Sequence, residues 1–225
     1  TIAELEEQFD TVLVVDFGAQ YAQLLARRVR EAHVYSEIVP HTVTAAEVAE
    51  RAPAGLILSG GPKSVHVEGA PRLDPAVYDL GIPILGICYG AQLVALELGG
   101  EVSNTGRGEY GRTDLAVQGE GLLFGPAQPA HQQVWMSHFD SITIAPAGFT
   151  VTATTADVPV AALEDVDRGI FGVQFHPEVV HTAYGQEVLE HFLYDAVAAP
   201  PTWTPSSIIE TQVALIREQV GDGRL

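Results

Sequence analysis

The chain has 225 residues, of which 47% are hydrophobic, and this length suits one α/β domain with a short appendage. A formal net charge of -18 with only 11 Lys and Arg residues argues against nucleic-acid partners and anionic membrane surfaces, because both need clustered positive charge. One cysteine excludes an internal disulfide, no apolar run approaches the roughly 20 residues that span a bilayer, and the acidic N-terminus does not resemble a signal peptide. We therefore expect a protein of the reducing cytoplasm.

The first part of the chain alternates predicted strands and helices. Residues 11–16 (TVLVVD) are typical of a strand buried on both faces, and QYAQLLARRVREA after them has the spacing of an amphipathic helix. Three further predicted strands lie at residues 34–40, 54–62 and 82–90, with helical stretches near 44–51 and 74–80. This alternation predicts right-handed βαβ units and a mostly parallel open sheet flanked by helices. Functional groups should gather past the carboxyl ends of its strands, where SGGP and GICYG lie.

From about residue 113 the pattern changes to short predicted strands joined by turns. They are RTDLAV, QVWMS, SITIAPAG, FTVTATT, VAALED and GIFGVQF. We expect a small antiparallel extension that lets GIFGVQF return beside the parallel core. A closing helix is then predicted over residues 184–198, with an inward face made of Val188, Leu189, Phe192 and Leu193.

The C-terminal segment differs in composition. APPTWTP is proline-rich and is predicted to be a linker. Ser207 and Glu210 then have the spacing of a capping box, and an apolar stripe of Ile209, Val213 and Ile216 indicates a helix before a turn in VGDGRL. Since one helix cannot form a core, we expect residues 1–199 to be one domain. Residues 200–225 would be a linker and first helix leading toward a second domain.

The motif GICYG places Cys88 between a predicted strand and a predicted helix. Glycine on both sides of a nucleophile at such a junction is the pattern of a nucleophile elbow, and Gly86 and Gly90 fit a turn too tight for a Cβ atom. The positive end of the helix would favour a thiolate at Cys88. A lone cysteine is more often a small buried core residue, so this motif alone leaves both interpretations open.

The sequence Gln174-Phe175-His176-Pro177-Glu178 supplies groups that could activate a thiol. Residues two apart in an extended segment point to the same side, so His176 and Glu178 should lie together, and Pro177 disfavours the helix that would separate them. A carboxylate fixes the tautomer of an adjacent imidazole and stabilises its protonated form. We therefore predict a catalytic triad of Cys88, His176 and Glu178. No metal-ligand spacing is present.

A thiolate that attacks a carbonyl group also needs donors for the oxyanion. The backbone N–H of Tyr89, directly after Cys88, is one candidate. The SGGP loop offers a second, for which we choose Gly61 over Gly60, and each donor could contribute about 3 kcal/mol to transition-state stabilisation. The alternative is that SGGP is an ordinary turn.

These motifs together resemble a known family. GICYGAQ, GVQFHPE and LSGGP are similar to class I (triad) glutamine amidotransferases, and the resemblance runs over nearly the whole chain. More narrowly, DFGAQYAQLLARRVRE, EYGRTDL, VWMSH and HPEVVHT resemble the amidotransferase domain of the guanosine monophosphate (GMP) synthetase family. The Pro-Trp linker and IREQVGDGRL resemble the junction to that family's ATP-pyrophosphatase (synthetase) domain.

The resemblance implies a flavodoxin-like sheet and the hydrolysis of the glutamine side-chain amide through a thioester on Cys88. Ammonia would pass to the synthetase domain, which aminates xanthosine monophosphate (XMP) to GMP. The family implies that Gln92, Ser137, His138 and Phe139 hold the amino-acid end of glutamine, with Asp140 nearby. It implies no cofactor for the domain present, and ATP and Mg²⁺ only for the synthetase domain.

Two positions depart from the family pattern. Phe139 stands where a small residue is usual, and Gly108 replaces the arginine of an Arg-Glu-Tyr-Gly motif, with Arg107 displaced by one. Three alternatives remain open: an amidotransferase domain that serves another synthetase, a γ-glutamyl hydrolase of the same fold, and a catalytically silent interaction module.

Overall fold

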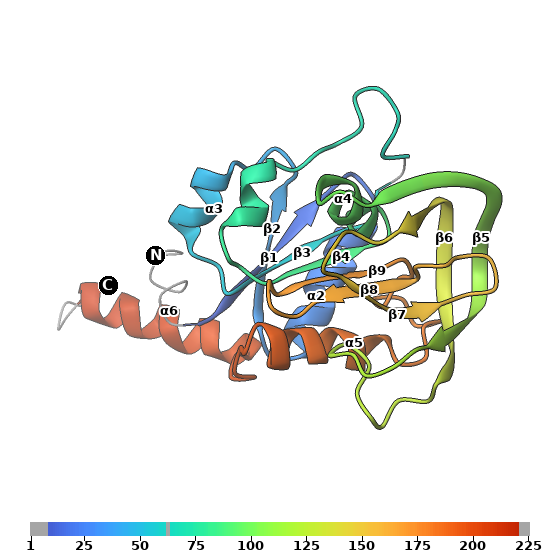
Figure 1. Cartoon of the computed structure of the whole chain (residues 1–225). Coiled ribbons are helices and arrows are strands. Elements are labelled where there is room, and N and C mark those ends of the chain that lie inside the picture. Colours follow the sequence, from blue (N-terminus) through green and yellow to red (C-terminus); the bar gives the residue numbers. More distant parts are fainter. Residues whose placement is uncertain (1–8, 62–63, 221–225) are drawn as a thin grey trace.

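The computed structural model describes residues 9–61 and 64–220, with backbone alone at residues 208, 211, 214, 215 and 218–220. Within these ranges the chain forms one nine-stranded sheet in the order β2-β1-β3-β4-β9-β8-β7-β5-β6, with helices packed against it (Figure 1). No helix in the described ranges is long and apolar enough to span a bilayer.

The first five strands in this order are parallel, as predicted. They are β2 (Tyr35–Pro40), β1 (Thr11–Asp16), β3 (Gly55–Leu58), β4 (Ile84–Ile87) and β9 (Ile170–Val173). Their order along the sheet, 2-1-3-4 and then the last strand, is that of flavodoxin-like folds. The expectation that GIFGVQF returns beside the parallel core is confirmed, because β9 pairs with β4.

Alternating side chains of the parallel strands pack into two separate cores. In β1, Val12 and Val14 face helices α2 (Tyr21–Glu31) and α5 (Gly185–His191). Leu13 and Val15 face the opposite core, which contains residues of α3 (Ala45–Arg51), the 3₁₀ helix η1 (Pro75–Asp79) and α4 (Tyr89–Glu97). Burial on both faces explains why these strands are continuous apolar runs.

The antiparallel extension consists of β8 (Ala162–Asp165), β7 (Thr150–Thr154), β5 (Glu101–Val117) and β6 (His131–Ile144). It is confirmed, but its predicted boundaries were wrong in two places. RTDLAV is only the end of β5, which begins at Glu101, and QVWMS and SITI belong to one strand, β6. Inside β6 every second side chain is buried, and this alternation continues through the polar residues His138 and Asp140. Because buried strand positions are expected to be apolar, these two residues led to the prediction of two strands where there is one.

The predicted closing helix is present as α5 followed by a π-helical segment, η2 (Phe192–Ala196). The four residues expected to face inward are all fully buried: Val188, Leu189, Phe192 and Leu193.

The linker is fixed to the domain by Trp203, whose side chain is buried. Its backbone N–H donates to His33 O at 2.9 Å, and the Arg30 guanidinium lies 5.7 Å from the centre of its ring. Helix α6 (Pro205–Val220) follows and runs along one side of the fold to the C-terminal end of the chain, in red in Figure 1.

The predicted capping box of Ser207 and Glu210 was wrong, because α6 begins at Pro205 and Ser207 N donates to Thr204 Oγ1. Proline is favoured in the first turn, where its missing N–H costs nothing. The predicted apolar stripe is exposed to solvent. The exposed fractions of its residues are 64% for Ile209, 38% for Val213 and 55% for Ile216. The turn predicted in VGDGRL lies almost entirely outside the described residues.

Candidate active site

The predicted elbow is present between β4 and α4. Cys88 has φ 51° and ψ -105°, a strained backbone conformation for a residue with a side chain. A Cβ atom at Gly86 would lie 2.6 Å from Gly90 O, and one at Gly90 would lie 2.3 Å from Leu58 O. Both glycines are therefore required by close approach of backbone atoms.

The Cys88 side chain is buried, and its polar partners are Ser137, Gln174 and His176. Its Sγ donates to Ser137 O at 3.6 Å and accepts from Gln174 Nε2 at 3.6 Å. The Cys88 N–H donates to Val173 O at 2.8 Å and so ties the elbow to β9. The sulfur lies at the N-terminal end of α4, where the helix dipole stabilises negative charge.

His176 and Glu178 lie side by side, as predicted, just after β9. His176 Nδ1 is 2.7 Å from Glu178 Oε1, and both side chains are buried. The extended segment expected here was wrong, because β9 ends at Val173 and a bend and a turn follow it, so other elements bring the two side chains together. His176 N donates to Trp135 O at 2.9 Å, and Arg28 Nε donates to Glu178 O at 2.9 Å.

The surroundings of His176 favour its protonated form. Burial alone would lower the pKa of this imidazole, but hydrogen bonding and charge from Cys88 and Glu178 outweigh burial and raise the pKa well above its ordinary value. The ring of Tyr21 covers one side of the imidazole, with ring centres 4.9 Å apart. The site thus combines a nucleophile candidate, a protonated base and an orienting carboxylate.

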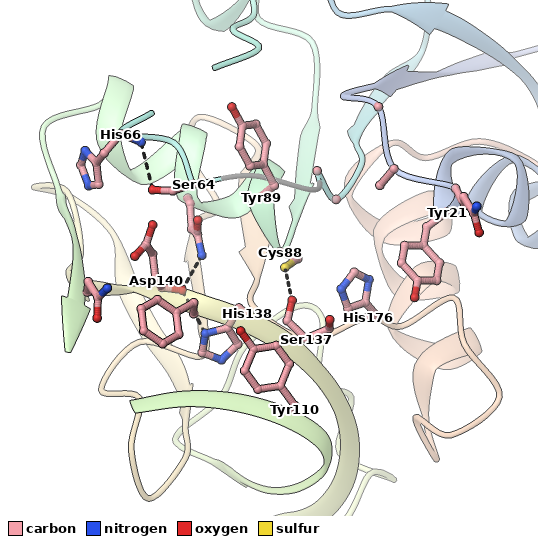
Figure 2. A pocket seen from close by; sticks show the side chains of 18 residues that line it. Tyr21, Ser64, His66, Cys88, Tyr89, Tyr110, Ser137, His138, Asp140 and His176 are labelled. Carbon is pink, nitrogen blue, oxygen red and sulfur yellow. Dashed lines mark hydrogen bonds between the residues drawn. The ribbon is translucent and has the colours of Figure 1, made fainter. Parts of the chain in front are cut away.

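A pocket of about 820 Å³ opens over these groups (Figure 2). Every predicted site residue lines it except Glu178, which is hydrogen-bonded to the ring of His176. The pocket is closed on one side by Gly18 to Tyr21, after β1, and on the other by residues of β5 and β6. Among the described residues, no group of three or more His, Cys, Asp and Glu side chains is arranged to hold a metal ion.

The two predicted oxyanion donors are neighbours. The Tyr89 ring is buried, its hydroxyl donates to Pro71 O at 2.6 Å, and a Cβ atom on Gly61 would lie 2.8 Å from Tyr89 Cγ. The Tyr89 N–H belongs to the first turn of α4 and has no acceptor within the helix. A Cβ atom on Gly60 would lie 3.1 Å from His176 Cε1, so both glycines of SGGP border the reacting groups. The preference for Gly61 over Gly60 stays a prediction.

At the other end of the pocket, Gln92 is buried and donates through Nε2 to Asp140 O at 2.7 Å and to Gln174 Oε1 at 3.2 Å. The His138 ring turns to protein partners, with Nε2 3.0 Å from Glu109 Oε1. Phe139 is 50% exposed at the rim.

The departure at Gly108 and Arg107 has a local structural account. Arg107 forms an ion pair with Asp157 at 2.9 Å, and both side chains are exposed. A Cβ atom on Gly108 would lie 2.9 Å from His138 O, so this backbone position has no room for an arginine without a shift.

The polar residues of this region that were not predicted include Gln174, Glu109 and Tyr21. Gln174 stands two residues before His176, but a bend and a turn follow β9, so the alternation of an extended strand does not predict its place. Glu109 and Tyr21 meet their partners only through tertiary contacts.

Comparison with known proteins agrees with this geometry. A family model for glutamine amidotransferase class-I matches residues 13–196. Curated relatives include the glutamine-hydrolysing GMP synthase of Thermobifida fusca, 60% identical over 97% of this chain, and that of Streptomyces avermitilis, 59% identical over 96%. The chain spans 41% of the length of each relative.

Among solved structures, a putative GMP synthase subunit from Thermoplasma acidophilum is 33% identical, with a TM-score of 0.76. The match covers 91% of this chain and 98% of that one. The family model and this nearly complete match show that the chain belongs to the class I glutamine amidotransferase family.

Proposed function

We propose that this chain is the glutaminase part of a GMP synthase. It would hydrolyse the side-chain amide of glutamine to glutamate and ammonia, and a synthetase domain would use the ammonia to aminate XMP to GMP. The observation that carries the proposal is the strained Cys88 elbow that shares one pocket with His176, whose ring is hydrogen-bonded to Glu178. The names of the curated relatives support the identity of the product.

The first half-reaction would form a thioester. The Cys88 thiolate attacks the carboxamide carbon, and the oxyanion accepts hydrogen bonds from the backbone N–H groups of Gly61 and Tyr89, each worth about 3 kcal/mol. The C–N bond then breaks, and His176 gives its proton to the leaving NH₂ group, which departs as ammonia. The raised pKa of His176 supports this role, because the ring holds the proton that the leaving group needs.

The second half-reaction would release glutamate. Neutral His176 takes a proton from water, and the resulting hydroxide attacks the thioester carbon. The C–S bond breaks, the sulfur leaves as the thiolate, and His176 is protonated again. Glu178 holds the imidazole in one tautomer and stabilises its protonated form throughout. These steps need only groups of the chain, glutamine and water.

The amino-acid end of glutamine would bind between Gln92 and the segment 137–140. Asp140 supplies the single carboxylate among the described residues that line the pocket, so its charge would pair with the α-ammonium group of glutamine. Ser137, His138 and Phe139 would contribute mainly through their backbone, since the His138 ring is engaged by Glu109.

The division at residue 199 belongs to the same proposal. Residues 1–199 would be the amidotransferase domain, and the Trp203 linker and α6 would lead to a synthetase domain that uses ATP and Mg²⁺. The chain's 41% share of its relatives' length supports a further domain of this kind.

Amination assays with a GMP synthetase domain test the proposal. The Cys88→Ala variant should lose glutamine-dependent GMP formation and keep ammonia-dependent formation. Loss of both activities would indicate a structural role for Cys88. Ammonia delivery only to a different synthetase would instead favour the alternative of an amidotransferase domain that serves that synthetase.

A further inference from the structure

The ladder between β5 and β6 is interrupted beside the pocket. Asn104 pairs with Asp140 and Glu109 pairs with His138, so four residues of β5, 105–108, lie opposite Phe139 alone. Such a bulge removes ladder hydrogen bonds where β6 forms the pocket wall. Phe139 therefore has no single ladder partner, and the wall needs further support at this point, although His138 and Asp140 on either side still pair with β5.

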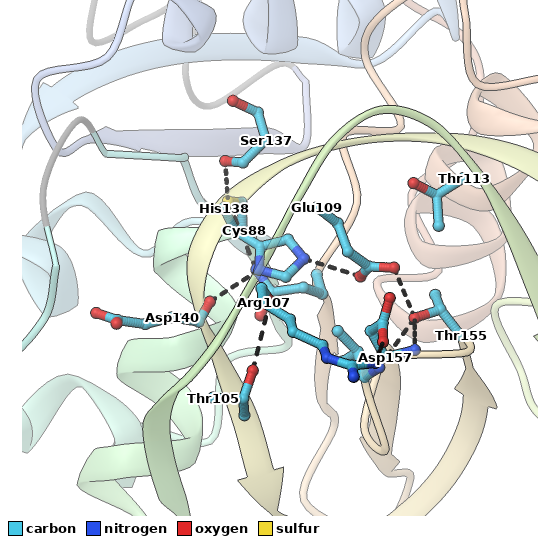
Figure 3. A network of polar contacts seen from close by, with 12 residues as sticks. Cys88, Thr105, Arg107, Glu109, Thr113, Ser137, His138, Asp140, Thr155 and Asp157 are labelled. Carbon is cyan, nitrogen blue, oxygen red and sulfur yellow. Dashed lines mark hydrogen bonds and ion pairs between the residues drawn. The ribbon is translucent and has the colours of Figure 1, made fainter.

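Buried side chains take over this task (Figure 3). His138 Nδ1 lies 2.9 Å from Asp140 O, and His138 Nε2 lies 3.0 Å from Glu109 Oε1. Thr155 Oγ1 donates to the second carboxylate oxygen of Glu109 at 2.8 Å. The His138 side chain is 1% exposed and that of Glu109 is 7% exposed.

The protons of this network follow from its acceptors. The Asp140 carbonyl can only accept, so His138 Nδ1 carries a hydrogen. The other ring nitrogen lies 3.0 Å from Glu109 Oε1, so the carboxyl group holds the second side of the ring. Without a partner at Nε2, the ring could move its proton to that atom, and the bond to Asp140 O would be lost.

The same carbonyl orients the substrate side of the pocket. Asp140 O also accepts from Gln92 Nε2, and the second hydrogen of this amide goes to Gln174 Oε1. Both bonds are made by the amide nitrogen of Gln92. Since Gln92 lines the pocket, its amide oxygen is left to accept a hydrogen bond from a ligand. The position of the Asp140 carbonyl thus determines how Gln92 presents its amide to a ligand.

We propose that Glu109 and His138 are a positioning pair that fixes residues 138–140 and Gln92 to receive the amino-acid end of glutamine. The pair touches neither the reacting amide nor the sulfur, and the inference rests on the proposed function, since it concerns the same pocket. Disruption of the pair should weaken glutamine binding and leave the reactivity of Cys88 unchanged.

Two electrophiles separate these effects in the 225-residue chain. A chloroketone analogue of glutamine needs the amino-acid end of the pocket, whereas iodoacetamide needs only the Cys88 sulfur. Glu109→Ala should slow labelling of Cys88 by the chloroketone about tenfold, because the variant loses a buried hydrogen-bonding partner of His138. Labelling by iodoacetamide should change less than about twofold. In hydrolysis assays KM for glutamine should rise by about the same tenfold, with kcat nearly constant.

Three further variants sharpen the test. Glu109→Gln can donate to His138 Nε2 and accept from Thr155, so it should restore most of the labelling by the chloroketone. Thr155→Val keeps the size of the side chain but removes the hydrogen bond to Glu109, so it should slow labelling by the chloroketone less than Glu109→Ala does. This variant provides the test if Glu109→Ala does not fold. Glu164→Gln changes a buried carboxyl group of β8 that bonds to Leu122 N, and it should leave both labelling rates unchanged.

Equal slowing of both reagents by Glu109→Ala would overturn the proposal, as would unchanged labelling by the chloroketone. A Glu109→Gln variant as impaired as Glu109→Ala would equally contradict positioning by hydrogen bonds. Failure of the chloroketone to label the unmodified chain, with or without a synthetase domain, would instead count against the proposed function.

Discussion

The parallel half of the sheet and its antiparallel extension hold their parts of the site by different physical means. In the parallel half, short strands buried on both faces end in turns that carry Cys88, Gly61 and His176, and the ends of these strands set their positions. In the extension, the long strands β5 and β6 carry polar side chains and a bulge, and buried hydrogen bonds such as that between His138 and Glu109 fix the pocket wall. Chemistry should therefore depend on the first region and glutamine binding on the second.

The largest effect is expected for Cys88→Ser. A hydroxyl at the elbow lacks the low pKa of a thiol, so kcat for glutamine hydrolysis should fall by a factor on the order of 10⁶, as for loss of a triad nucleophile. Steady-state measurement of glutamate release checks this. Ammonia-dependent amination by the synthetase domain is the control and should not change. A variant that retains most of its glutaminase activity would remove Cys88 from the mechanism.

Glu178→Gln should lower kcat by roughly 10³- to 10⁴-fold, because the imidazole loses the carboxylate that orients it and stabilises its charge. The pKa of His176 should also fall in this variant, and NMR titration of the ring can measure it. A pKa of His176 that does not fall would show that Glu178 does not stabilise the charged ring.

The same pair predicts a pH dependence of stability. Since the pKa of His176 is raised in the folded state, its contribution to the free energy of unfolding is fully present below about pH 6.5 and is lost as pH rises through the raised pKa. The difference in Tm between the unmodified chain and Glu178→Gln should thus be larger at pH 6 than at alkaline pH. A difference that grows with pH would contradict this assignment.

Gly61→Ala tests the oxyanion donors. The new Cβ atom would lie 2.8 Å from Tyr89 Cγ and would displace the loop, so kcat should fall by about 10² while KM changes little. Val67→Ala, at a residue of the following loop that is 48% exposed and does not line the pocket, serves as a control for loop substitutions. If Gly61→Ala raises KM alone, this loop binds substrate and does not stabilise the oxyanion.

Phe139→Ala should have the smallest effect of this series. The side chain is half exposed at the rim, so its loss should raise KM by no more than about tenfold and leave kcat unchanged. A fall in kcat with constant KM would break the proposed separation between the two regions.

The sequence predicted the parallel half better than the extension, for a physical reason. Cys88 with its glycines is a local pattern, because a tight elbow is defined within a few residues. His176 and Glu178 are also close in the chain, but a turn and not an extended step brings them together. The bulge opposite Phe139 and the bond between Glu109 and His138 join residues far apart in the chain, and no periodicity encodes them. The buried polar residues of β6 also break the apolar alternation by which strands are recognised.

The tail illustrates the same limit. Its helix was predicted from spacing, but the start of α6 depends on Pro205 and on the bond between Thr204 and Ser207. Burial of Trp203 against Arg30 and His33 has no counterpart in the local sequence.

Mass spectrometry of the acyl-enzyme tests the central claim most directly. The chain is mixed with glutamine, quenched in acid during turnover and digested, and each peptide is searched for a γ-glutamyl adduct. The proposed mechanism predicts one adduct, a thioester on the peptide that contains Cys88, absent from Cys88→Ala. Glutamine turnover by the Cys88→Ala variant, or an adduct on any other residue, would contradict it.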